Sequence, residues 1–186
     1  MGKAVIFFAD GFEECEGLIT VDILRRAGAD IKTLSITDSL TVKSAHSVEI
    51  KCDGLAKDTD IMSADLMILP GGMPGTYNLA DSNIVNNALM KFAASNKKIA
   101  AICAAPYVLA RLGLLKGKKA TAYKSFRDKL TGAEVLDREV VVDGNITTGW
   151  GLGAAIPFAH ELARQLEGES AAERVRAGID YIHYIH

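Results

Sequence analysis

The chain has 186 residues, 49% of them hydrophobic, and its 21 Lys and Arg nearly balance its 23 Asp and Glu, which leaves a formal charge of −2. A core of this size removes roughly 70% of the unfolded chain's surface from water, so we expect one domain over residues 1–186 that folds without a disulfide or structural metal. The balanced charge provides no basic surface for a nucleic acid or an anionic membrane, which excludes both as expected partners.

The predicted strands and helices alternate along the chain. The first strand, 3–8, is a continuous apolar run, as a strand covered on both faces requires, and Gly28 ends the helix that follows it. This alternation predicts an α/β fold with a mostly parallel sheet and helices on both faces. Further strands are expected at 31–36, 65–69 and 98–102, and helices at 13–27, from a cap at 81–82 to about 95, and at 106–112, 154–166 and 171–179.

Two segments interrupt this alternation. Residues 42–51 suit a small antiparallel excursion, and residues 139–148 are typical of a hairpin that turns at Asp143-Gly144. Both segments predict antiparallel pairing at the edges of the fold.

The three cysteines, Cys15, Cys52 and Cys103, are odd in number, widely spaced and without a CxxC motif. That pattern argues against both a disulfide framework and a zinc site, and nothing in the sequence calls for a cofactor. The apolar run before Asp10 is too short for a signal peptide or a membrane span, so we expect a cytoplasmic protein.

Cys103 lies where a predicted buried strand runs directly into a helix. A residue at such a sharp turn projects above the carboxyl edge of the sheet, where open α/β folds bind ligands. The unpaired N–H groups at the start of the helix favour a thiolate, so we expect a lowered thiol pKa and a reactive nucleophile. The alternative is a small core thiol that only fills space, because free cysteine is among the most buried residue types.

Two further segments are expected at the same edge of the sheet. Gly71 and Gly72 follow another buried strand, where their N–H groups can form an oxyanion hole, although a simple turn with positive φ has the same sequence. Glu16 shares a helix face with Ile19 and Thr20, so its carboxyl can be partly buried and protonated, and can then hydrogen-bond a thiolate or move a proton. Spacing alone leaves that role of Glu16 open.

The remaining candidates have simpler interpretations. Cys15 is surrounded by glutamates, which disfavour a thiolate, and Cys52 has no activating neighbour. His46 falls in the antiparallel excursion and His160 within a late helix, so no cysteine–histidine pair is predicted. The C-terminal segment 181–186 offers histidines to a metal, but a frayed or docked tail is the expected interpretation, and no metal site is predicted.

Four segments share their sequence with one known family. They are Gly-Phe-Glu-Glu-Cys-Glu at 11–16, Val-Asp-Ile-Leu-Arg-Arg-Ala-Gly at 21–28, Leu-Pro-Gly-Gly at 69–72 and Ala-Ile-Cys-Ala-Ala-Pro at 101–106. In this order they resemble the ThiJ/PfpI superfamily, and more narrowly the clade of the parkinsonism-associated protein deglycase (DJ-one). The similarity runs almost from end to end.

The resemblance implies a flavodoxin-like three-layer sandwich that usually forms a homodimer. It implies that Cys103 is the nucleophile, that Glu16 is its protonated partner, and that the N–H groups of Gly71, Gly72 and Ala104 form the oxyanion site. Members of the family convert methylglyoxal to lactate without glutathione, are proposed to remove early glycation adducts, and act as oxidation sensors and chaperones. The implied substrate is a small aldehyde or a glycated group.

Two positions depart from the family pattern. Tyr123 stands where the clade has a histidine, and because a tyrosine donates a hydrogen bond but is a poor base at neutral pH, we expect at most an auxiliary role for it. Ala104 stands where the protease-like branch has a histidine after its cysteine, which disfavours peptidase activity.

The leading hypothesis is a glyoxalase or deglycase, in which the Cys103 thiolate adds to an aldehyde and Glu16 moves the protons. One alternative is an oxidation sensor in which Cys103 becomes a sulfinate. The other is a scaffold or chaperone without chemistry, for which Cys103 would be fully buried and unreactive.

Overall fold

The computed structural model describes residues 1–181. Its central sheet consists of β1 (Lys3–Phe8), β2 (Asp30–Ser35), β5 (Gly54–Leu55), β6 (Leu66–Leu69), β7 (Lys98–Ile102), β10 (Val140–Asp143) and β11 (Ile146–Gly149). In space the strands follow the order β10-β11-β7-β6-β1-β2-β5, and every neighbouring pair is parallel except the hairpin of β10 and β11. The predicted mostly parallel sheet and its antiparallel edge hairpin are confirmed.

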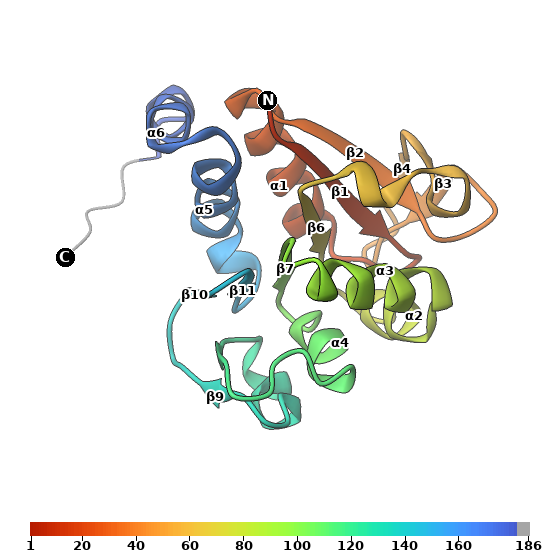
Figure 1. Cartoon of the computed structure of the whole chain (residues 1–186). Helices are drawn as coiled ribbons and strands as arrows, with labels where there is room; N and C mark the ends of the chain where they lie inside the picture. The colour runs from red at the N-terminus through yellow and green to blue at the C-terminus, as the bar shows by residue number, and fades with distance from the viewer. Residues whose placement is uncertain (182–186) are drawn as a thin grey trace.

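Helices cover both faces of this sheet (Figure 1). One face carries α1 (Glu14–Ala27), α5 (Ala155–Glu167) and α6 (Glu169–Gly178), which pack against one another. The other face carries α2 (Gly75–Asp81), α3 (Asn83–Ala94) and α4 (Pro106–Arg111). This is the three-layer arrangement of a flavodoxin-like α/β fold.

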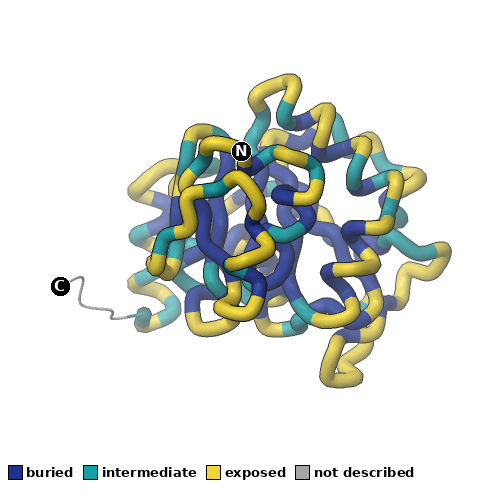
Figure 2. The backbone as a smooth tube through the Cα atoms, turned by 90° about the horizontal axis from the view of Figure 1, so that it is seen from below, coloured by how far each residue is buried: buried dark blue, intermediate teal, exposed yellow. Residues whose placement is uncertain are grey.

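The side chains of β1 alternate between two apolar cores. Val5 and Phe7 pack on the side of α2, α3 and α4, whereas Ile6 and Phe8 pack on the side of α1 and α5. Because both faces of the strand contact a helical layer, all of these positions are apolar. Figure 2 shows the buried stretches of backbone gathered in the interior and the exposed loops around them.

The sequence did not predict every element. Helix α2 begins directly after Pro74, and a Pro-Gly sequence there indicates a turn rather than a helix start. The strands β8 (Lys119–Ala120) and β9 (Glu134–Val135) pair in parallel and are too short to show a periodicity. The predicted antiparallel excursion is confirmed by β3 (Thr41–Lys43) and β4 (Glu49–Lys51).

Two expectations concern the surroundings of the protein and its C-terminal tail. No helix within residues 1–181 has the length and hydrophobicity that crossing a membrane requires, and the cytoplasmic location stays a prediction. The interpretation of 181–186 as a frayed or docked tail depends on 182–186, which lie outside the described residues.

Candidate active site

Cys103 lies between the end of β7 and the start of α4, at the carboxyl edge of the sheet. Its backbone has φ 66°, in the left-handed region that residues other than glycine seldom adopt. Two hydrogen bonds hold the turn: the Cys103 N–H donates to the Gly149 carbonyl at 2.9 Å, and the Tyr123 N–H donates to the Cys103 carbonyl at 2.8 Å. The thiol is only partly exposed, and the sharp strand-to-helix turn expected from the sequence is present.

Glu16 lies in the first turn of α1 with 1% of its surface exposed, and its carboxyl is hydrogen-bonded to the Cys103 thiol. The Gly71 N–H donates to Glu16 Oε2 at 2.9 Å. Behind this pair, the Glu16 N–H donates to the Glu13 carboxylate at 2.7 Å, so Glu13 caps the helix that carries Glu16. The structure therefore brings together Glu16 and Cys103, which are far apart in the sequence. Their spacing along the chain had left open whether they are in contact.

Gly71 and Gly72 have no room for a side chain. A Cβ on Gly71 would lie 2.5 Å from Cys103 Cβ and 2.7 Å from Glu16 Oε2, and one on Gly72 would lie 2.2 Å from the Glu13 nitrogen. Because these two positions are glycine, the loop after β6 can lie close to both Cys103 and the first residues of α1.

The three N–H groups expected to form an oxyanion site are divided between two acceptors. Those of Gly72 and Ala104 hydrogen-bond to Cys103 sulfur, whereas that of Gly71 donates to the Glu16 carboxyl. Gly71 thus positions the acid in this structure and is not free to bind an oxyanion.

The pKa values of Glu16 and Cys103 are coupled. Burial raises the pKa of Glu16 to about 7, and the charge of Glu13 adds to the rise, while hydrogen bonds with Cys103 and Gly71 oppose it. Burial also raises the pKa of the Cys103 thiol, as do the charge and hydrogen bond of Glu16, while the N–H groups of Ala104 and Gly72 lower it.

The lowered thiol pKa expected from the helix start is therefore wrong. The N–H groups act in the expected direction, but burial and the Glu16 carboxylate outweigh them. Because ionising both groups would place two negative charges in contact, Glu16 and Cys103 share one proton over a wide range of pH above 7.

Tyr123 lies beside the cysteine, and 43% of the residue is exposed. A Cβ on Gly151 would lie 3.3 Å from Tyr123 Cδ2 and 3.9 Å from Cys103 Sγ, so the tyrosine ring and the sulfur flank the same glycine. Gly151, in the glycine-rich segment in front of α5, therefore forms part of the surroundings of Cys103. The sequence signal for it was the density of glycine, which by itself indicates only a loop.

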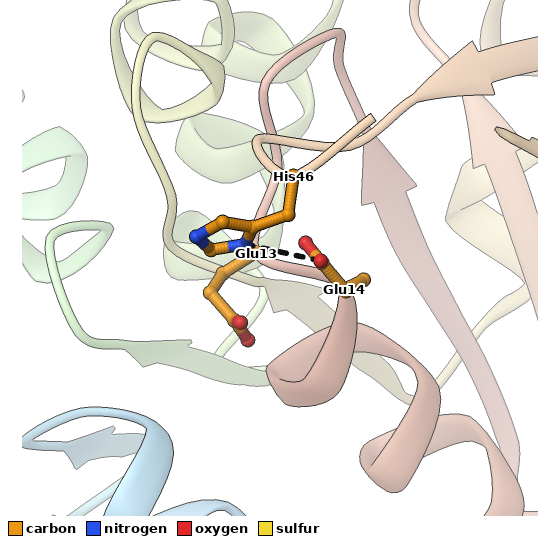
Figure 3. A group of neighbouring side chains, drawn as sticks. All are labelled: Glu13, Glu14 and His46. Carbon is orange, nitrogen blue, oxygen red and sulfur yellow. Dashed lines mark hydrogen bonds and ion pairs between the residues drawn. The ribbon is translucent and has the colours of Figure 1, made fainter. Parts of the chain in front are cut away.

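A second cluster lies at the start of α1, where Glu13, Glu14 and His46 offer ligand atoms within 4.8 Å of one another (Figure 3). His46 Nδ1 lies 3.0 Å from Glu14 Oε1. Although burial opposes it, hydrogen bonds from its own backbone N–H, His46 and Ser44 lower the pKa of Glu14. These groups have the chemistry of divalent-metal ligands, and sequence spacing missed them because His46 is brought in by the excursion. The expectation that the chain holds no metal stays a prediction.

The other two cysteines and His160 are not part of the site around Cys103. Burial and three nearby glutamates raise the pKa of Cys15, and burial raises that of Cys52 to about 11. His160 Nε2 lies 3.4 Å from Glu173 Oε1, between α5 and α6. These three residues agree with the simpler interpretations taken from the sequence.

Comparison with known proteins places this arrangement in a family. The chain is 40% identical over 167 residues to Protein DJ-1 homolog B of Arabidopsis thaliana, covering 89% of this chain but only 38% of that protein. It is 34% identical over 158 residues to Glutathione-independent glyoxalase DJR-1.2 of Caenorhabditis elegans, covering 84% of this chain and 83% of the relative. Among solved structures, oxidized DJ-1 of Toxoplasma gondii superposes with a TM-score of 0.94 at 35% identity, covering 98% of this chain and 100% of that one. The DJ-1/PfpI family model matches residues 2–165, and the chain belongs to the DJ-1/PfpI family.

Proposed function

We propose that this chain is a glyoxalase that needs no glutathione, acting on methylglyoxal, and that the same chemistry serves early glycation adducts as a deglycase. The observation that carries the proposal is the hydrogen-bonded pair of Cys103 and the buried Glu16, whose pKa of about 7 lets it exchange a proton at neutral pH. The C. elegans relative, which is a glutathione-independent glyoxalase, supports it.

The proposed reaction begins when the Cys103 thiol passes its proton to Glu16 and the sulfur adds to the aldehyde carbon. The oxygen anion that forms accepts hydrogen bonds from the N–H groups of Gly72 and Ala104. These N–H groups no longer bond to the sulfur once it is attached to carbon. Glu16 returns its proton to that oxygen, and the hemithioacetal forms.

Glu16 then moves the aldehyde hydrogen, as a proton, from the first carbon to the second, and the hydroxyl proton passes from the oxygen of the first carbon to the ketone oxygen. This leaves a thioester on Cys103, and water hydrolyses the thioester to release lactate, a proton and the free thiol. Methylglyoxal plus water equals lactic acid, so the first carbon is oxidised as the second is reduced and no outside oxidant is needed. Tyr123 can donate a hydrogen bond to the substrate but does not act as the base.

Turnover is expected to rise with pH through about 7 and then level off. Below that pH both Glu16 and Cys103 carry protons, and above it the pair holds one negative charge that can move to the sulfur. The second ionisation lies far higher, because the thiol pKa is raised while Glu16 is charged. The measurement is kcat/KM for methylglyoxal from about pH 5 to about pH 9. A rate that falls across this range would contradict the shared-proton mechanism.

A second candidate is an oxidation sensor. Cys103 is partly exposed, and the N–H groups of Gly72 and Ala104 at its sulfur would also stabilise the oxygens of a sulfinate. A protonated Glu16 would donate to the same oxygens. The two candidates use the same residues and differ in whether an aldehyde is turned over.

We also propose that the chain forms a homodimer, as the family resemblance implies. An apolar groove of about 510 Å³ runs along α1 and the end of α6, and Leu18 at its rim is 40% exposed. Exposed apolar surface of this kind is typical of protein interfaces. The apolar side chains that line the groove are Leu18, Ile19, Ile23, Ile156 and Ile179.

Leu18→Asp is expected to convert the dimer to a monomer, because a carboxylate would lose its water on entering an apolar interface. The matched control is Leu40→Asp, since Leu40 is also an exposed leucine but lies outside the groove. Sedimentation velocity measures both variants. A wild-type chain that sediments as a monomer, or a Leu18→Asp variant that stays dimeric, would contradict the proposal.

A further inference from the structure

A second groove lies next to Cys103 and shares only Tyr123 with the reaction described above. It has a volume of about 280 Å³ and lies between the residues after β8 and the glycine-rich segment in front of α5. Gly151 connects it to the reacting sulfur, since this glycine lines the groove and a Cβ on it would lie 3.9 Å from Cys103 Sγ. The residues that line the groove are Tyr123, Lys124, Arg127, Trp150, Gly151, Leu152 and Gly153.

The walls of this groove combine aromatic and apolar side chains with the cations Lys124 and Arg127. Tyr123 and Leu152 are 43% and 49% exposed. The Arg127 guanidinium lies 6.0 Å from the centre of the Trp150 ring, within the range of a cation–π contact. The Arg127 guanidinium is itself held by an ion pair with Asp137 at 2.9 Å and by donating a hydrogen bond to the Ala122 carbonyl at 3.1 Å.

We propose that this groove binds the substituent of the aldehyde substrate, and that the chain acts on α-oxoaldehydes with an aromatic substituent, such as phenylglyoxal. This inference rests on the proposed glyoxalase function. The methyl group of methylglyoxal leaves the groove empty, whereas its volume, just below the roughly 300 Å³ of the smallest pockets for drug-sized ligands, suits one ring. The faces of Tyr123 and Trp150 offer a ring stacking or edge contacts.

The chemistry balances as it does for the smaller substrate. Phenylglyoxal plus water gives mandelate and a proton: sulfur adds to the aldehyde carbon, the aldehyde hydrogen moves as a proton to the neighbouring carbon while the hydroxyl proton moves to the ketone oxygen, and water cleaves the thioester. The aldehyde carbon is oxidised as the ketone carbon is reduced. The groove contributes only binding energy and orientation, at a place the reacting atoms do not reach.

The first test compares initial rates with phenylglyoxal and methylglyoxal for the wild type and for Leu152→Ala, a truncation at an exposed position. We expect kcat/KM for phenylglyoxal to fall at least about fivefold in this variant while that for methylglyoxal changes less than about twofold. Leu40→Ala makes the same truncation at another exposed leucine and is expected to change neither rate. Initial rates are used because arylglyoxals also modify arginine slowly.

The second test measures binding without turnover. Trp150 is the single tryptophan of the chain, so intrinsic fluorescence reports directly on this groove. Mandelate, the unreactive product, is titrated into wild type and Leu152→Ala, with lactate as the acid that lacks a ring. We expect saturable quenching by mandelate, an affinity weakened at least about fivefold in the variant, and no response to lactate.

The two tests separate the groove from the glyoxalase function. If methylglyoxal is turned over but mandelate does not quench Trp150, or if Leu152→Ala slows both aldehydes equally, the assignment of the groove is overturned and the proposed function stands. If mandelate quenches but neither aldehyde is turned over, the glyoxalase function is refuted, and with it the claim that arylglyoxals are substrates.

Discussion

Cys103→Ala is expected to abolish lactate formation from methylglyoxal, a loss of at least about 10³-fold, because the sulfur is the atom that bonds to the substrate. The fold should persist, since the substitution keeps the Cβ and removes only a partly exposed sulfur. Lactate is measured after incubation without glutathione, and circular dichroism compares the folding of the variant with that of the wild type.

Cys15→Ala is the matched control, because Cys15 is an exposed thiol whose raised pKa makes it a poor nucleophile. It should keep the wild-type rate. Lactate formation that survives in Cys103→Ala would refute the mechanism. Wild-type protein that turns over no aldehyde, but in which mild peroxide oxidises Cys103 selectively by mass spectrometry, would favour the oxidation sensor instead.

Glu16→Gln is expected to lower kcat/KM by about 10²- to 10⁴-fold, the range for loss of a general acid–base group. The amide can still accept the Gly71 N–H and contact the sulfur, so the positions of these atoms should change little. What is lost is the group that carries the proton between the thiol and the two substrate carbons. The rate is measured with methylglyoxal at pH values on both sides of 7.

The same variant is expected to be more stable than the wild type at alkaline pH. The folded state raises the Glu16 pKa from 4.5 to about 7, so it binds this proton more tightly than the unfolded state does. That contribution to stability is fully present below about pH 4.5 and is lost as pH rises through about 7, a change of up to about 3 kcal/mol. The glutamine amide of the variant does not titrate, so the difference in unfolding free energy between variant and wild type should grow over this interval.

Urea unfolding at about pH 5 and about pH 8 measures this difference. Glu49→Gln, which removes a carboxylate at an exposed position in β4, is the control. A Glu16→Gln variant that keeps full activity would contradict the proton-shuttle role. A difference in stability that does not change with pH would contradict the raised pKa.

Local sequence patterns predicted the strands and helix ends whose form depends on hydrophobicity along the chain or on a single residue type. The strands 3–8 and 98–102 have the predicted boundaries, because continuous apolar runs occur where helices cover both faces of a sheet. Gly28 ends α1 with φ 98°, a conformation that glycine adopts readily. Helix α2 was missed because its start at Pro74-Gly75 is stabilised by packing against the loop after β1 rather than by a local signal, with the Gly75 N–H donating to the Gly11 carbonyl.

By itself the sequence determined the alternation of strands and helices and the place of Cys103 at a strand-to-helix junction, because both depend on periodicity and on neighbours along the chain. Spacing along the chain left the contact of Glu16 with that cysteine open, and the tertiary structure decided it. Only the tertiary structure decided that the Gly71 N–H is used by the acid and that the pKa of the thiol is raised rather than lowered. The physical reason is that desolvation and the interaction of two ionisable groups depend on what the whole fold packs around them. The N–H groups at a helix start affect the pKa of residues within about one turn of the chain. Burial, in contrast, is caused by segments that are distant in the sequence.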